Sequence, residues 1–400
     1  MNRLKFLFLF ASYAIFLIGL LIYSFSQVDL NLTISSNIYY QVFQEYLLDL
    51  GYFNRPLSTA FYVVIILFLF IFYLLILHLV RYLRITKVQI IYLLIVGIVI
   101  LFLSYPAFSY DIYNYMFDAR IITKYLQNPY IHKALDFPAD PWIRFMHWTH
   151  RTYPYGPIWL LVTLPVSFLG FGKFVLTLIN FKLMFLLFYL GNIFLIGKIL
   201  GKTSPQNRLL GVSLYAFNPV ILLESLVSPH NESAMLFFLL LAIYMGIVRK
   251  SSFWWIGGLL LSGGIKFISL ILIPLKYFYG KNIILENKYA TFLKVCLLLL
   301  TLLVVFQIYQ RDPYPWYFIT LIGLASLLPF NFKTRLLLYG VTFGALLYYI
   351  PYLYIGYYPS YVRTAQTAMF LVPIVSAIIW LLIVFIKGKL KFVKVFSKNK

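Results

Sequence analysis

The sequence predicts an all-α polytopic membrane protein: a bundle of about 11–13 transmembrane helices with a long outer loop that carries juxtamembrane helices. Of the 400 residues, 62% are hydrophobic and only 11% are charged, whereas soluble domains carry about 25% charged residues. The apolar residues fall into runs of roughly 20, the length that crosses a bilayer. The net charge of +22 does not indicate nucleic-acid binding, because lysines and arginines cluster between the apolar runs.

Ten apolar stretches are predicted to span the membrane: 4–25, 57–80, 88–104, 174–197, 209–227, 233–248, 290–309, 316–330, 336–352 and 366–386. We interpret the first as a retained anchor, because no clear small-residue cleavage site marks it as a signal peptide. Residues 158–172 contain Pro165 and Gly170, and residues 253–279 contain "SGGIK". Such breaks are tolerated where protein or water satisfies the freed backbone groups. We therefore expect a re-entrant or interfacial segment and a hairpin of two short helices, respectively.

The distribution of lysine and arginine predicts the orientation. "MNRLK" at the N-terminus, "RYLRITK" at 81–87 and the lysine-rich tail 387–400 are expected on the cytoplasmic side of the plasma (inner) membrane. Residues 27–56, 105–157 and 310–315 then lie outside. All seven aspartates fall on that outer side, which suggests that any chemistry takes place there.

The outer loop 105–157 opens with "SYDIYNYMFDAR" at 109–120. The pattern from Asp111 to Leu126 fits an amphipathic helix, on which Asp111 and Asp118 are two turns apart and share a side. Because Asp111 lies a few residues beyond a membrane helix, at the depth of lipid headgroups, its carboxylate could act as general base toward a lipid-linked substrate. The alternative is an interfacial helix that only anchors tyrosines at the lipid headgroups.

Ionisable residues also interrupt later apolar runs. Glu224 lies in "NPVILLESLVSPHNES" at 218–233 and is followed at the next turn by the triplet "HNE" at 230–232. Intramembrane acids are expensive and are functional candidates by default, although a capped helix turn is the alternative. Lys266 follows a double glycine and could hold a lipid phosphate or extend toward the membrane surface. The triplet spacing does not specify a metal site, although the outer acids are compatible with a divalent metal ion.

The order of these motifs resembles a known family. "YDIYNYMFDAR" is followed by "NPY" at 128–130, "YPYGP" at 153–157 and the Glu224 segment with its "HNE" triplet. This order resembles the GT-C fold membrane glycosyltransferases that use polyprenyl-phosphate sugars. It looks closest to the bacterial polyprenol-phosphate-mannose-dependent α-mannosyltransferases. The resemblance covers roughly residues 88–280 of one integral membrane domain, with C-terminal helices over 281–386.

The resemblance implies that Asp111 is the catalytic base and that Asp118 is the second acid of the loop. It also implies that residues of the later motifs line the same cavity, and we add tyrosines as flat walls for sugar rings and arginines for the phosphate. The predicted donor- and acceptor-binding residues are Tyr110, Tyr115, Arg120, Tyr130, Tyr153, Pro154, Glu224, His230, Asn231, Glu232, Lys266 and Arg363.

The predicted activity is transfer of a hexose, with mannose favoured, from a polyprenyl-phosphate sugar to an acceptor glycan or glycolipid on the outer face. Direct displacement would invert the anomeric configuration through an oxocarbenium-like transition state. The main alternative is a transporter or flippase of lipid-linked saccharides, which would carry polar residues near the bilayer midplane. A hydrolase of lipid-linked sugars and a non-catalytic scaffold of the cell envelope are further alternatives.

Overall fold

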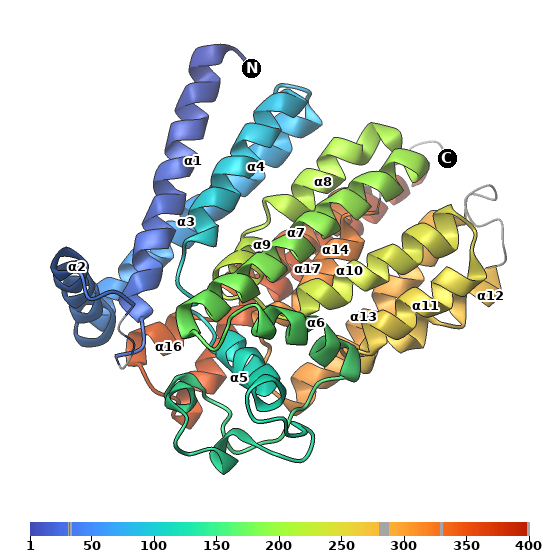
Figure 1. Ribbon diagram of the computed structural model, residues 1–400. Coiled ribbons are helices and arrows are strands. Elements are labelled where there is room, and N and C mark those ends of the chain that lie inside the picture. The colour runs from blue at the N-terminus through green and yellow to red at the C-terminus, as the bar shows by residue number, and fades with distance from the viewer. Residues whose placement is uncertain (31, 33, 280–287, 329–330, 398–400) are drawn as a thin grey trace.

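The computed structural model describes residues 1–30, 32, 34–279, 288–328 and 331–397, and this part of the chain is built of helices without a strand (Figure 1). The α-helices are α1 (Arg3–Ser24), α2 (Ile38–Leu48), α3 (Arg55–Arg81), α4 (Lys87–Phe102), α5 (Asp111–Thr123), α6 (Pro157–Phe168), α7 (Phe174–Thr203), α8 (Arg208–Ala216), α9 (Pro219–Leu222), α10 (Glu232–Ile243), α11 (Ser252–Gly263), α12 (Leu275–Tyr279), α13 (Tyr289–Gln310), α14 (Phe318–Ala325), α15 (Phe332–Leu347), α16 (Ile350–Ile355) and α17 (Ser360–Ser397). The prediction of an all-α polytopic membrane protein is confirmed.

The membrane-spanning helices differ in length. Among the described residues, six helices are long and apolar enough to cross a bilayer, and the bent pair of Pro205–Ala216 and Pro219–Val227 makes up to seven. Five further apolar helices have 10–17 residues, short of the roughly 20 that a full crossing needs. Three predicted spans, 88–104, 233–248 and 316–330, fall in this shorter class, and the last of them ends outside the described residues.

The two interrupted segments form short helices. Residues 158–172 give α6, whose twelve residues include Pro165. Residues 253–279 form α11, a turn at 264–266, the 3₁₀ helix η8 (Phe267–Leu272) and α12. Helix α11 packs against η8, as a hairpin requires. The connection that follows, 280–287, lies outside the described residues.

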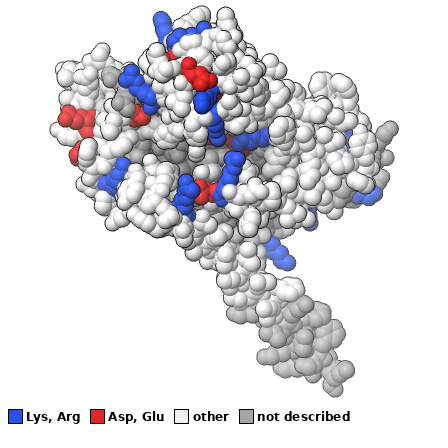
Figure 2. All heavy atoms as spheres, turned by 90° about the horizontal axis from the view of Figure 1, so that it is seen from below, with Lys and Arg blue, Asp and Glu red and all other residues white. Residues whose placement is uncertain are grey.

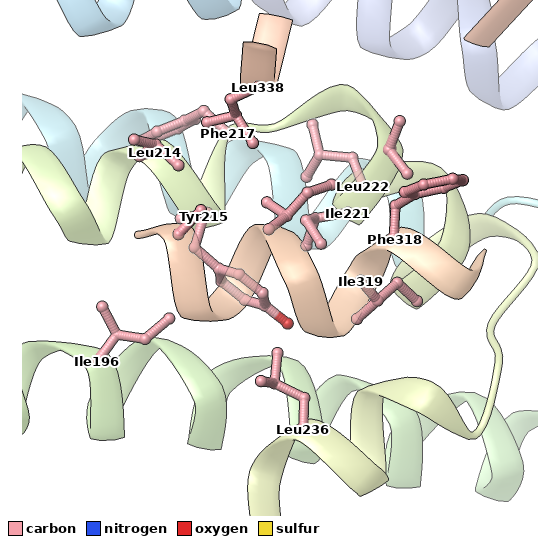
Figure 3. Close-up of a cluster of buried hydrophobic side chains, with 14 of the residues drawn as sticks. Ile196, Leu214, Tyr215, Phe217, Ile221, Leu222, Leu236, Phe318, Ile319 and Leu338 are labelled. Atoms are coloured by element: carbon pink, nitrogen blue, oxygen red, sulfur yellow. The ribbon is translucent and has the colours of Figure 1, made fainter. Parts of the chain in front are cut away.

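The helices run side by side, so the bundle has two distinct ends (Figure 1). One end carries α5, α16 and the loop between α5 and α6. The opposite end carries the N-terminus and the connections from α3 to α4 and from α7 to α8. Between them, buried apolar side chains of α7, α8, α9, α10, α14 and α15 form a continuous core (Figure 3). This packing holds the break between α9 and α10 in a fixed place.

Helix α5 corrects one prediction. It begins at Asp111 as expected, but it is not an amphipathic helix at the membrane surface, because residues 112–121 are all buried. Helices α6 and α7 pack against it, and 3₁₀ turns at Ala134–Asp136 and Pro141–Phe145 cover it further. The loop therefore folds back over the polar side of α5, which a helical pattern alone could not reveal.

Candidate active site

Asp111 lies at the entrance of the site. It is the first residue of α5, and its backbone amide donates to Ser109 Oγ at 3.2 Å. Its side chain is 15% exposed, whereas the residues that follow are buried. A carboxylate in the first turn of a helix is favoured by the unpaired amides there. Asp111 thus combines access for a substrate with a fixed position at the start of a helix.

A buried histidine faces this carboxylate. His230 Nε2 lies 3.9 Å from Asp111 Oδ2, and His230 Nδ1 lies 3.1 Å from Glu224 Oε2. The Tyr349 hydroxyl donates to the other oxygen of Glu224, Oε1, at 2.7 Å. Burial lowers the pKa of His230, but the carboxylates of Glu224, Asp111 and Glu232 outweigh burial and hold that pKa above its usual value. The protonated imidazole is therefore favoured beside Asp111 more than in a free histidine.

The break before α10 explains how Glu224 and His230 come together. Asn218 Oδ1 accepts from the amides of Val220 and Ile221, which starts α9 directly after α8 at a bend of 54°. The chain then widens into a π-helix (η6, Leu223–Val227), a distortion found often at functional sites. It turns back so that the His230 amide donates to the Glu224 carbonyl at 3.0 Å. The "NP" and "HNE" motifs thus begin and end the same helix break, which places Glu224 beside His230.

A second connection ties this break to α5. The amide of Phe108, three residues before Asp111, donates to Ser228 Oγ at 2.8 Å. The segments that carry Asp111 and His230 are therefore joined by a backbone-to-side-chain hydrogen bond as well as by the contact between the two side chains.

Aromatic residues missed by the sequence reasoning cover the histidine. Trp316, in the 3₁₀ helix η9 (Pro315–Tyr317), stacks on His230 with ring centroids 4.1 Å apart and an interplanar angle of 13°. Tyr314 stacks on the far side of Trp316 at 4.4 Å. The sequence signal was the run "DPYPWY" at 312–317, which by itself indicates only a proline-rich helix entry.

Lys266 and Glu232 form an ion pair. Glu232 is the first residue of α10 and is almost fully buried, whereas the Lys266 side chain is 25% exposed. The ammonium also lies 5.7 Å from the centroid of the Tyr155 ring. Asn231, beside Glu232, is buried. Lys266 therefore points from the turn after α11 into the same region as the "HNE" triplet, with part of its surface open to solvent.

Two glycine motifs meet at this point. The Gly156 amide donates to the Ile265 carbonyl at 3.1 Å, and the Ile158 amide donates to the Gly264 carbonyl at 2.9 Å. A Cβ added to Gly156 would lie 2.1 Å from the Gly264 oxygen. Only glycine allows this approach. The "YPYGP" loop end is thus built onto the break that carries Lys266.

Asp118 is buried two turns along α5 and is 8% exposed. Burial raises the pKa of its carboxyl to about 7, against the opposing charge of Arg151 and with a further rise from Asp111. Nearby, the Tyr153 amide donates to the Pro129 carbonyl at 2.9 Å, and the Tyr153 ring packs edge-on against Tyr130 at 5.1 Å. The "NPY" and "YPYGP" motifs therefore pack together.

Arg120 occupies a different environment. Its Nε lies 2.8 Å from Asp140 Oδ2, and its guanidinium lies 3.9 Å from the centroid of the Trp142 ring. Lys124 Nζ contacts the same oxygen at 2.9 Å. These hydrogen bonds, with one from Tyr125, hold the pKa of Asp140 below its usual value although burial opposes them. Arg120 is buried within this cluster and fastens the loop to α5.

The other predicted residues differ in exposure. Tyr110 is half-buried and stacks on His147 with centroids 4.0 Å apart. Tyr115 is buried, with its ring edge-on to Trp159 at 5.2 Å. Pro154 is exposed, and Arg363 is exposed near the start of α17.

Charged side chains gather at this end of the bundle. Figure 2 views the molecule from below and shows lysines, arginines, aspartates and glutamates around a hollow. Within the part of the chain that the structure describes, no group of three or more His, Cys, Asp or Glu residues is placed to hold a metal ion.

The helical membrane bundle and the charge network at one end define a polytopic membrane protein with an enzyme-like site. The family MptA_B, described as alpha-(1->6)-mannopyranosyltransferase, N-terminal domain, matches residues 30–279, and the chain belongs to this family. It is therefore an integral membrane glycosyltransferase of an α-mannosyltransferase family. No curated protein and no solved structure matches the chain.

The match confirms the resemblance seen in the motifs and extends it. It begins at residue 30, whereas the motifs led us to expect it from about residue 88. Helices α2 and α3 therefore belong to the matched region. Trp316 and Tyr349, which contact His230 and Glu224, lie beyond its end.

Proposed function

We propose that the enzyme transfers mannose from a polyprenyl-phosphate donor to a hydroxyl of an acceptor glycan or glycolipid on the extracytoplasmic face. The observation that carries this proposal is the partly exposed Asp111 carboxylate beside the buried His230–Glu224 pair. A carboxylate that is accessible on one side and held in place by buried side chains on the other suits a general base.

In the proposed reaction the acceptor hydroxyl gives its proton to Asp111. Its oxygen forms a bond to the anomeric carbon while the bond from that carbon to the phosphate oxygen breaks. The phosphate leaves with the electron pair, and displacement from the opposite face inverts the anomeric configuration. The transition state is oxocarbenium-like. Because phosphate is a good leaving group, a base and an electrostatic clamp on the phosphate suffice.

Lys266 is the cation that we assign to the donor phosphate. It is partly exposed and lies on the turn that meets the "YPYGP" loop end. Its pairing with Glu232 restrains the ammonium, and the phosphate would approach from the open side. We give Arg120 a structural role, since its contacts are with Asp140 and Trp142. Arg363 stays a second candidate for the phosphate.

The remaining residues define the walls. Tyr110 and Tyr130 present aromatic surfaces that suit the apolar faces of sugar rings, whereas Tyr153 is buried and packs behind Tyr130. Asp118, with its pKa near 7, is protonated for part of the time at neutral pH and would bind an acceptor hydroxyl rather than act as the main base.

The test is transfer by the full chain in lipid nanodiscs, with polyprenyl-phosphate mannose, glucose and arabinose offered to a panel of acceptor glycans. Asp111→Asn should abolish transfer while donor binding persists. Asp136→Asn is the matched control, because Asp136 is an exposed carboxylate of the same loop, paired with His132 at 3.4 Å. Its activity should equal that of the native enzyme.

Other outcomes would change the proposal. Full activity of Asp111→Asn would move the base elsewhere, first to Asp118 or Glu232. Release of free mannose without an acceptor would indicate a hydrolase. Donor movement across the bilayer without transfer would indicate a flippase.

Sidedness has its own test. Ser36 is exposed in the segment between α1 and α2, at the end of α1 away from the N-terminus, and Gln206 is exposed in the connection from α7 to α8. In a Cys296→Ser background, Ser36→Cys should react with an impermeant thiol reagent in intact cells and Gln206→Cys should not. The reverse pattern would place Asp111 in the cytoplasm and exclude the proposed orientation of the site and of the C-terminal tail.

A further inference from the structure

A second cavity lies at the end of the bundle opposite Asp111. It has a volume of about 240 Å³ and lies where α3 ends and α15 begins. Its lining residues are Leu74, Leu77, His78, Arg81, Tyr82, Arg335 and Tyr339. Nothing in the proposed transfer reaction uses this cavity.

The charged residues that line the cavity are all basic. Arg81 from α3 and Arg335 from α15 face the same space, His78 lies one turn before Arg81, and none of the seven lining residues is acidic. Two guanidinium groups that share a cavity make it attractive to an anion. The rule that basic residues flank the cytoplasmic side explains why arginines occur at this end. It does not explain why two of them, from helices far apart in the sequence, converge on one cavity.

Aromatic packing fixes the geometry of the cavity. The Tyr339 ring contacts Phe70 and Tyr73 of α3 edge-on, with centroids 6.3 and 6.0 Å away. At the rim, the Tyr82 ring lies 4.7 Å from the His78 ring and 5.9 Å from the Arg81 guanidinium. The basic groups are therefore held on packed helices and not on loose loops.

The cavity is also amphipathic. Arg81 and His78 are exposed at its rim, whereas Leu77 is buried and Leu74 is half-buried on the side toward the bundle. At roughly 30 Å³ for each water, the volume would hold about eight waters, which is more room than a phosphate group needs. Guanidinium groups bind phosphate oxygens in a bidentate manner.

We propose that this cavity binds the phosphate of an anionic lipid headgroup, with Arg81 and Arg335 on the phosphate oxygens and the leucines against the start of the acyl region. The shared chemistry is a phosphate oxyanion, and a soluble phosphate is the other possible source. The proposal does not depend on the transferase reaction at the opposite end.

The test is native mass spectrometry of the full chain in detergent, titrated with phosphatidylglycerol and, as a reference, phosphatidylcholine. The variant Arg81→Gln/Arg335→Gln should lose about thirtyfold in affinity for phosphatidylglycerol, since each basic residue near an anionic lipid contributes a factor of about five. The matched control is Arg249→Gln, which removes an exposed arginine in the connection from α10 to α11, outside the cavity. It should bind like the native protein.

Two further measurements keep the result unambiguous. The variant Arg81→Lys/Arg335→Lys keeps the charge but loses the bidentate contacts, so its affinity for phosphatidylglycerol should lie between those of the native protein and the glutamine variant. If the glutamine variant unfolds, the lysine variant should still bind phosphatidylglycerol more weakly than the native protein. Inorganic phosphate that displaces the lipid would show that a soluble phosphate can occupy the site. Lipid that resists displacement would assign the site to lipid alone. Equal phosphatidylglycerol binding by the native protein and a folded glutamine variant, or an equal loss in Arg249→Gln, would overturn the proposal.

Discussion

The support of Asp111 by His230 and Glu224 makes the sharpest prediction. Glu224→Gln keeps the size of the side chain and an acceptor for the Tyr349 hydroxyl, but it removes the charge 3.1 Å from His230 Nδ1. Without that charge, burial favours neutral imidazole. Asp111 then loses the cation 3.9 Å away.

The magnitude follows from this distance. Two unit charges about 4 Å apart interact by about 4 kcal/mol at an effective dielectric constant of 20. The partial exposure of Asp111 lowers this figure, and a loss of about 2 kcal/mol corresponds to a thirtyfold fall in kcat/KM. Because Glu224 raises the pKa of His230, the pH at which activity changes with His230 protonation should move down in Glu224→Gln.

The assay is mannosyl transfer in nanodiscs between pH 5.5 and 9, with donor binding measured separately. Tyr349→Phe is the control, because it removes one hydrogen bond to Glu224 and leaves both charges in place. It should reduce kcat/KM less than Glu224→Gln does and leave the pH profile unchanged. If Glu224→Gln is folded, binds donor and keeps the native rate and pH profile while Asp111→Asn is inactive, the proposed role of the pair is refuted.

Three further predictions concern stability. Gly156→Ala should destabilise the fold by about 2 kcal/mol in thermal unfolding, because its Cβ would meet a backbone oxygen at 2.1 Å. Gly257→Ala is the control: its Cβ would have nothing within 4 Å, so it should be neutral or slightly stabilising. Equal melting temperatures of the two variants would contradict this prediction. The pKa of Asp118 is raised from 3.8 to about 7, so the folded state binds more protons than the unfolded state between these pH values. The free energy of unfolding should therefore fall by about 4 kcal/mol as the pH rises from 3.8 to about 7. Asp118→Asn should flatten that pH dependence, and an unchanged slope would show that the carboxyl is not buried as described. Arg120→Gln should lower stability by about 3 kcal/mol, because it removes one partner of the buried Asp140, and limited proteolysis should then cut within the loop; an uncut loop would contradict the structural role.

Much of the fold follows from the sequence because membrane helices leave a local signal. Apolar runs and basic clusters predicted the long helices α1, α3, α7 and α13 close to their observed bounds, since lipid demands about 20 apolar residues wherever a helix crosses. The shorter helices were harder to judge, because protein rather than lipid surrounds part of their length. Helix α5 shows this best: its polar residues suggested a surface position, and the loop that buries them follows in the sequence with no periodic pattern of its own.

Some features of the candidate site could be predicted from the sequence, and others could not. Three features were visible as departures from an apolar background: Asp111 a few residues after a membrane helix, the charged triplet at 230–232 and the glycines before Lys266. The family match covers all of them. The sequence did not reveal the separate cluster that engages Arg120, because its partner Asp140 lies in an irregular loop.

What the sequence by itself determined is therefore the helical membrane class, the family and which polar residues stand out, because hydropathy and motif order are local properties of the chain. Only the tertiary structure decided the partners: His230 beside Asp111, Trp316 over His230 and Tyr349 on Glu224. Each of these contacts joins residues about a hundred positions apart. Their geometry depends on the bend between α8 and α9 and on the packing of α14 and α15, which arise from the whole bundle and leave no periodic trace in any one segment.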